Sequence, residues 1–191
     1  MDERGRSRTI PLDIVNSQSL KKIPVTKLDA VRRQLETGVI LWFHDGDPVS
    51  IHTLIAAAYQ ILYNLNQKRG GSPMMKNGKN IRPEYLREWH RVLAKWENFF
   101  KHADRDPLET LLFPPQVTRT FMLDAIEKYH ELAHEQRPLF RLFTSYLAAN
   151  EPRLFKKESL ENFPNDDKLN LAEFSKREFF HYGLLLFRKI E

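Results

Sequence analysis

The fold class is decided by the stretch YLREWHRVLAKWENFFKHA, residues 85–103. At 100° per residue, the side chains of Arg87, Arg91, Lys95, Asn98 and His102 fall within an arc of about 80°. The apolar side chains occupy the opposite arc of the same helix. This division predicts an amphipathic α-helix that buries one face and presents a line of cations, an amide and an imidazole to water or to a ligand. We call these five residues the basic stripe.

Helical periodicity extends over most of the chain. Thr26 with Asp29 is typical of a helix cap, and Asp47 followed by Pro48 is typical of another. Strand signals are scarce and no internal repeat is present. The pattern predicts an all-α protein, an up-down bundle of four to six helices. The expected helices run from Thr26 to His44, from Pro48 to about residue 66, over Pro83–Ala103, over Val117–Gln136, from Pro138 to near Glu151, and over Leu169–Ile190.

Helix-breaking residues and changes in composition divide the chain into three parts. Residues 1–24 lack a hydrophobic pattern and are expected to be a flexible basic arm. Residues 25–150 are expected to form the helical bundle core, and residues 151–191 a C-terminal helical extension packed on it. A further basic loop, rich in Gly, Lys and Asn, is expected to be flexible over residues 67–82.

Composition limits the classes of protein to consider. There are no cysteines, which excludes disulfides and thiolate metal sites. No apolar run reaches the roughly 20 residues that span a bilayer, and the first residues lack the apolar segment of a signal peptide. We therefore expect a cytoplasmic protein with no membrane partner and no cofactor.

The positive charge is concentrated in the middle of the chain. Residues 68–105 contain ten Lys or Arg and four acids, a local balance of +6, whereas the whole chain carries +5. Such a basic segment favours a phosphate-bearing partner such as RNA or a nucleotide. The alternative is an ordinary solvated helix surface.

Three segments resemble a family of uncharacterised bacterial helical proteins: residues 27–36, residues 45–54 and NFFKHADRDP at residues 98–107. The resemblance covers most of residues 27–150. More distantly, a helical bundle with Asn98 and His102 near the end of an internal helix is similar to the HEPN superfamily. That superfamily comprises small helical domains of toxin and defence ribonucleases and nucleotide-binding proteins.

The HEPN resemblance implies a site and an assembly. Its enzymes carry an Arg and a His separated by a few residues, and pair the motif across a homodimer. Asn98 and His102 fit this motif, while Glu97 stands at the Arg position, so Lys95 would supply the cation. The resemblance thus implies catalytic roles for His102, Asn98 and Lys95 in metal-independent RNA cleavage. The residues expected to bind the ligand beside them are Arg87, Arg91, Lys101, Asp104 and His52.

Other interpretations of these residues stay open. Our main interpretation is that the protein binds RNA, a nucleotide or another phosphate-bearing ligand through the basic stripe; the alternatives are the HEPN-type ribonuclease and a protein-interaction scaffold. His102 near a helix C-terminus would then satisfy the last carbonyls, and His52 would be a polar residue on an apolar helix. If the helices that contain these two histidines pack antiparallel, a His/Asp group could converge and bind a divalent cation or a phosphate. Its members would be His44, Asp45, Asp47, His52, His102, Asp104 and Asp106.

The sequence HELAH at residues 130–134 matches the zincin pattern H-E-x-x-H. Its expected helix ends directly after His134, and no third ligand is specified. We interpret the match as chance, expect His130 and His134 to be exposed, and predict no metal site.

Overall fold

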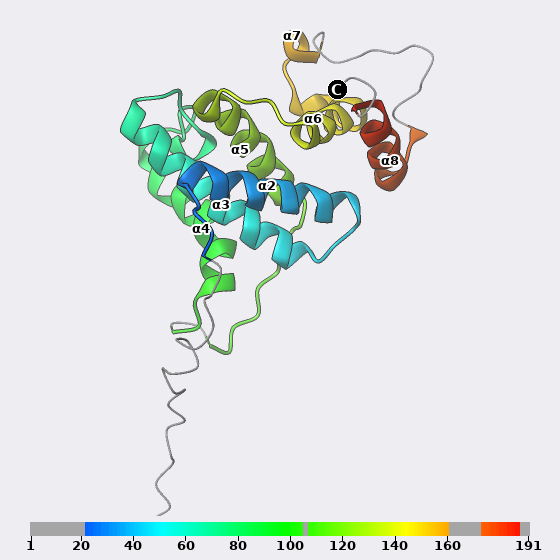
Figure 1. The fold of residues 1–191 in the computed structure, drawn as a ribbon. Helices are drawn as coiled ribbons and strands as arrows, with labels where there is room; N and C mark the ends of the chain where they lie inside the picture. Colours follow the sequence, from blue (N-terminus) through cyan, green and yellow to red (C-terminus); the bar gives the residue numbers. More distant parts are fainter. Residues whose placement is uncertain (1–21, 105–106, 161–172, 188–191) are drawn as a thin grey trace, which may run out of the picture.

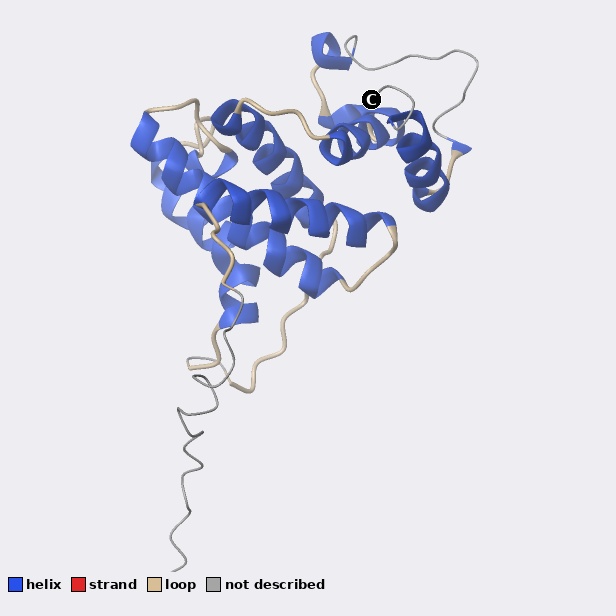
Figure 2. Ribbon diagram, in the orientation of Figure 1, coloured by secondary structure: helices blue, strands red, loops and turns tan. Residues whose placement is uncertain are grey.

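The computed structural model describes residues 22–104, 107–160 and 173–187, and in these residues it is all-helical, with no strand (Figures 1 and 2). The expectation of an all-α helical bundle is confirmed. Seven α-helices are present in the described residues: α2 (Lys27–Phe43), α3 (Pro48–Arg69), α4 (Leu86–Lys101), α5 (Val117–Ala133), α6 (Pro138–Asn150), α7 (Lys157–Leu160) and α8 (Lys176–Phe187). The 3₁₀ turns between them include η1 (Met75–Asn77), η2 (Pro83–Tyr85) and η3 (Pro152–Leu154).

Helices α2 and α3 form an antiparallel pair joined by a tight turn (Figure 1). The predicted caps are confirmed: Thr26 and Asp29 form a capping box, and the Asp47 carboxylate accepts a hydrogen bond from the Ser50 N–H at 2.7 Å. Gly38 allows the close approach of the two helices. A Cβ at Gly38 would lie 2.6 Å from Cδ1 of Ile55, which is fully buried.

The core lies between this pair and helices α5 and α6. Helix α5 packs along α3, and α6 crosses the C-terminal half of α2. The buried side chains follow the helical period that the sequence predicts. They include Val31, Leu35, Val39, Phe43, Ile55, Leu62, Met122, Ile126, Phe140 and Phe143.

Helix α4 packs against α3 along one edge only. Of its residues, all of which the structure describes, Leu93 alone is buried. The His52 ring in the first turns of α3 contacts Trp96 and Phe100 in the last turns of α4. The two helices are therefore antiparallel neighbours, as the sequence predicts. The expected single helix Pro83–Ala103 is shorter: η2 precedes α4, and His102 is its C-cap.

The segment between α3 and α4 is hydrogen-bonded to the core. Helix α3 continues to Arg69, and Gly70 ends it in the left-handed conformation with φ of 64°. Beyond it, Met74 is 2% exposed, and the Asp124 carboxylate accepts hydrogen bonds from the Met75 N–H and from the Tyr59 hydroxyl. The flexible loop expected over residues 67–82 is thus partly helical and partly anchored.

The C-terminal helix α8 lies against α6 and the end of α2 (Figure 1). Gly183 lets α8 approach α6, since a Cβ there would clash with Cδ1 of the buried Leu142. The arm expected over residues 1–24 lies outside the described residues, except for 22–24. The same is true of parts of the extension expected over 151–191. Among the described residues, no helix has the length and hydropathy to cross a membrane.

Candidate functional site

The basic stripe lies on the solvent face of α4, as predicted. Arg87, Arg91, Lys95, Asn98 and His102 are all exposed. At a rise of about 1.5 Å per residue, the stripe extends about 16 Å from Arg87 to Asn98. His102 follows as the C-cap: its backbone is extended, and its N–H donates to the Asn98 carbonyl at 3.0 Å.

Two of the stripe's cations, Arg87 and Lys95, have no ion-pair partner in the part of the chain that the structure describes. Arg91 pairs with Glu88 at 3.3 Å, but the two side chains are 77% and 61% exposed, so this pair competes weakly with another anion. Lys101 is held by Glu97 at 2.6 Å, and Asp104 is exposed beside the stripe.

Apolar side chains adjoin the stripe on the same exposed side of α4. Tyr85 is 53% exposed and Val92 is 41% exposed. Tyr85, Val92 and the half-buried Phe99 follow one another at intervals of seven residues, so they form one row. We call these three residues the apolar row. The exposed surface of α4 thus combines cations with an aromatic edge.

His52, expected beside the stripe, lies instead on the opposite, buried side of α4. Its side chain is 0% exposed and is surrounded by the rings of Trp96, Phe100, Phe113 and Phe121, with centroids 5.1–6.4 Å away. Burial lowers the pKa of His52 to about 4. A neutral imidazole enclosed by four rings has no access to a ligand on the stripe, so His52 does not belong to the exposed site.

The other acids and histidines at this end of the bundle serve local structure. His44 Nδ1 lies 2.8 Å from the Ile40 carbonyl, and Asp45 pairs with Lys176. Asp47 caps α3, and Asp106 lies outside the described residues. No group of three or more potential metal ligands occurs in the described part of the chain. The converging His/Asp group is therefore not found there.

The H-E-x-x-H motif does not have a zincin geometry. Helix α5 ends at His134, which adopts φ of 53°, so the two histidines are not both on a regular helix. Glu131 is bound by Lys128 at 2.5 Å and by the Ser72 hydroxyl. His134 is exposed as predicted, but His130 is only partly exposed. Its Nε2 is buried and has no hydrogen-bond partner in the described part of the chain, and burial lowers the pKa of His130.

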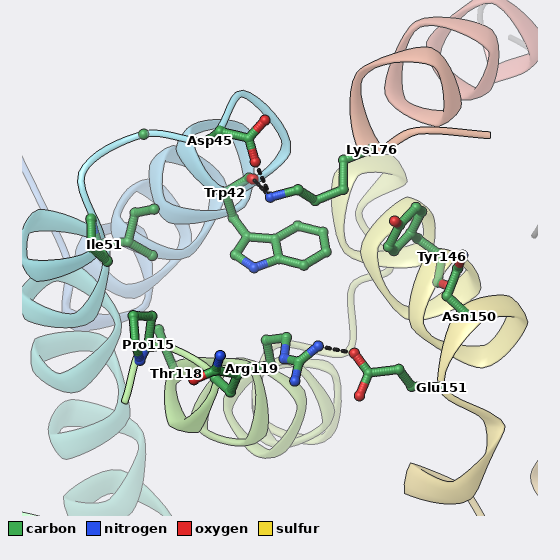
Figure 3. A pocket seen from close by; sticks show the side chains of 13 residues that line it. Trp42, Asp45, Ile51, Pro115, Thr118, Arg119, Tyr146, Asn150, Glu151 and Lys176 are labelled. Carbon is green, nitrogen blue, oxygen red and sulfur yellow. Dashed lines mark hydrogen bonds and ion pairs between the residues drawn. The ribbon is translucent and has the colours of Figure 1, made fainter. Parts of the chain in front are cut away.

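A second candidate site is a cavity of about 510 Å³ that the sequence did not predict (Figure 3). Five elements contribute to it: the end of α2, the start of α3, the start of α5, the end of α6 and the first residue of α8. The lining residues are Trp42, Asp45, Gly46, Pro48, Ile51, Pro115, Gln116, Thr118, Arg119, Tyr146, Asn150, Glu151 and Lys176. Trp42 and Tyr146 look like ordinary core residues in the sequence, so no local signal marks this site.

Two ion pairs flank the Trp42 indole in this cavity, Lys176 with Asp45 on one side and Arg119 with Glu151 on the other (Figure 3). Lys176 Nζ also lies 4.7 Å from the Trp42 ring centroid. The hydrogen bond from Lys176 is the main cause that lowers the pKa of Asp45, and burial raises the pKa of the Tyr146 hydroxyl. Both carboxylates of the cavity are therefore matched by cations at neutral pH.

Comparison with known proteins gives no relative: the chain matches no protein-family model, no curated protein and no solved structure. The resemblance to a bacterial helical family and to the HEPN superfamily stays a prediction. Functional inference therefore depends on the geometry of the stripe and of the cavity.

Proposed function

We propose that the protein binds single-stranded RNA through the exposed surface of α4. The observation that supports this most directly is the exposure of the whole basic stripe, with Arg87 and Lys95 free of ion pairs in the described residues. Unpaired surface cations in a line attract a phosphate backbone and release its counterions on binding. The spacing of Arg87, Arg91 and Lys95 along one helix face matches an extended polyanion better than a single compact phosphate.

The apolar row favours a single strand over a duplex. Proteins that bind single strands combine backbone cations with aromatic side chains on which bases stack. Tyr85 is exposed at one end of α4 and Phe99 is half-buried near the other, both beside the stripe. The bases of a duplex are stacked on one another inside the helix, so they cannot stack on such side chains.

We propose binding without cleavage. A general acid or base must be held within hydrogen-bond reach of the reacting group. The His102 imidazole is exposed and makes no hydrogen bond with a residue that the structure describes, and Asn98 and Lys95 do not orient it. The ribonuclease alternative therefore predicts that RNA itself completes the site, and the scaffold alternative predicts that RNA does not bind at all.

Fluorescence anisotropy with a labelled single-stranded RNA of about 20 nucleotides tests the proposal. Replacing Arg87, Arg91 and Lys95 together by Ala should weaken binding at least about tenfold near 0.1 M salt. Lys27→Ala with Arg33→Ala is the matched control, because both cations are exposed on α2 and lack ion pairs in the described residues. Equal affinity of the triple variant and the control would refute the proposal.

Two further measurements separate the alternatives. A duplex of the same sequence should bind more weakly than the single strand, and Tyr85→Ala should reduce this preference. Gel analysis should show intact RNA after incubation with the wild-type protein. RNA cleavage that His102→Ala abolishes would instead establish the ribonuclease alternative.

A further inference from the structure

The cavity between α2, α3, α5, α6 and α8 supports a second proposal, which does not depend on the basic stripe. Its volume of about 510 Å³ lies in the range of small-molecule sites, and its wall combines apolar surface with a few polar groups. We propose that this cavity binds a neutral, planar heteroaromatic molecule that both donates and accepts hydrogen bonds, of the size class of a purine base.

The charges of the cavity favour a neutral occupant. The described residues that line it include two cations, Arg119 and Lys176, and each pairs with a carboxylate of the same wall. An anionic ligand would face the carboxylates of Asp45 and Glu151, and a cationic ligand would face the two cations. A charged ligand therefore meets a like charge beside each opposite charge and competes with an existing ion pair, whereas a neutral ligand leaves both pairs intact.

The aromatic wall favours a planar ring. Trp42 lies in the middle of the lining residues, between the two ion pairs, and Tyr146 lies across the cavity from Ile51 and Pro115 (Figure 3). The Trp42 ring is fixed by edge contacts with Phe143 and Tyr146, with centroids 5.1 Å and 5.5 Å away. Fixed aromatic rings bind other aromatic rings by offset or edge contacts.

Polar groups at the wall supply both kinds of hydrogen bond. The Trp42 indole N–H has no acceptor among the described residues, and its nitrogen points toward the side of Thr118 and Arg119 (Figure 3). The Gln116 amide is exposed at the start of α5, and Asn150 uses its NH₂ group on the Tyr146 carbonyl at 3.0 Å, which leaves its side-chain oxygen as an acceptor. Donors and acceptors without a net charge match the edge of a heteroaromatic base.

Ligand-observed saturation-transfer NMR tests the proposal with three probes: adenine, benzoate and benzylamine. Adenine should give a saturable signal at concentrations up to about 1 mM, while the anion and the cation should bind at least about tenfold more weakly. Absence of an adenine signal, or equal binding of the three probes, would overturn the proposal and make the cavity a water-filled gap.

Variants locate the binding and test the charge argument. Asn150→Ala and Trp42→Leu should each weaken adenine binding at least about fivefold, whereas Gln67→Ala, an exposed amide on α3 outside the cavity, should leave it unchanged. Trp42 also packs in the core. If Trp42→Leu does not fold for this reason, the result for Asn150→Ala alone tests whether adenine binds in the cavity.

Glu151→Gln tests the charge argument by a gain of binding. The substitution removes the carboxylate that pairs with Arg119 and so leaves this cation free to bind an anion. This variant should gain benzoate binding about tenfold, with adenine affinity changed less than about threefold. Unchanged adenine binding in Asn150→Ala, or no gain of benzoate binding in folded Glu151→Gln, would overturn the proposal.

Discussion

His52 Nδ1 lies 3.0 Å from the hydroxyl oxygen of Thr118 and joins the second turn of α3 to the first turn of α5. Both side chains are buried, and the other ring nitrogen of His52, Nε2, has no hydrogen-bond partner among the described residues. The aromatic cage around this pair comes from α4, α5 and the segment between them. A single neutral imidazole thus links three parts of the bundle.

The burial of His52 predicts an acid-sensitive fold. The pKa of His52 is about 4 in the folded protein and near 6.5 in the unfolded chain. Between these values the unfolded chain takes up a proton that the folded protein does not, so the free energy of unfolding falls as the pH drops from about 6.5 to about 4. This group should account for a loss of about 2–3 kcal/mol, and for none above about pH 7.

Urea denaturation at about pH 7 and about pH 4.5 measures this loss. His52→Leu should have a smaller decrease between the two pH values, even if it is less stable at both. His130, whose pKa burial also lowers, and the capping carboxylates contribute equally to both proteins. An identical decrease in the wild type and in His52→Leu would show that His52 does not control the acid response.

Gly38 sets the distance between α2 and α3. Gly38→Ala places a methyl group against Cδ1 of Ile55, a contact of 2.6 Å that must relax. Overpacking of this kind costs about 1–3 kcal/mol, which the better helix propensity of Ala offsets by about 1 kcal/mol. Ile55→Val removes the methyl group that clashes.

A double-mutant cycle isolates this contact. Gly38→Ala should destabilise the Ile55→Val protein less than it destabilises the wild type, by at least about 0.5 kcal/mol in thermal or urea denaturation. Strictly additive effects would mean that the two helices separate without strain at this point.

Tyr59 anchors the segment before α4. Its hydroxyl donates to Asp124 at 2.6 Å and accepts from the Lys76 N–H at 3.0 Å. Tyr59→Phe leaves the Lys76 N–H without its acceptor and removes one of the two donors to Asp124, so we expect a loss of about 1–3 kcal/mol and faster amide exchange at Lys76. Tyr63→Phe is the control, because the Tyr63 hydroxyl makes no hydrogen bond with a described residue. Equal effects of the two substitutions would contradict the anchoring role.

Local signals explain what the sequence predicts well. The caps at Thr26 and Asp47 and the division of α4 into two faces depend on residues a few positions apart, and the structure contains them. The start of α6 at Pro138 follows from the same kind of signal. Each of these features is set by the backbone geometry of one helix.

Long-range packing explains what the sequence does not predict. The cage around His52 requires rings from positions 96, 100, 113 and 121, and the cavity requires five separate elements. The periodicity of α3 identifies His52 as one polar residue among apolar ones, but not which rings enclose it. The pairing of Lys176 with Asp45 likewise joins positions more than 130 residues apart.

The homodimer that the HEPN resemblance implies stays a prediction. Exposed apolar side chains away from the basic stripe, such as Tyr182 and Leu185 on α8, are available to a second copy. Light scattering at micromolar concentration should give twice the mass of the chain, which is 22.7 kDa. A monomeric mass would contradict this prediction.

The salt dependence of RNA binding tests the central claim most directly. Each phosphate contact of a single strand adds about 0.7 to the slope of log K against log salt concentration. The slope of the triple variant Arg87→Ala, Arg91→Ala, Lys95→Ala should therefore be smaller than that of the wild type by about 2, while the Lys27→Ala, Arg33→Ala control keeps the wild-type slope. Equal slopes for the wild type and the triple variant would show that the stripe contacts no phosphates.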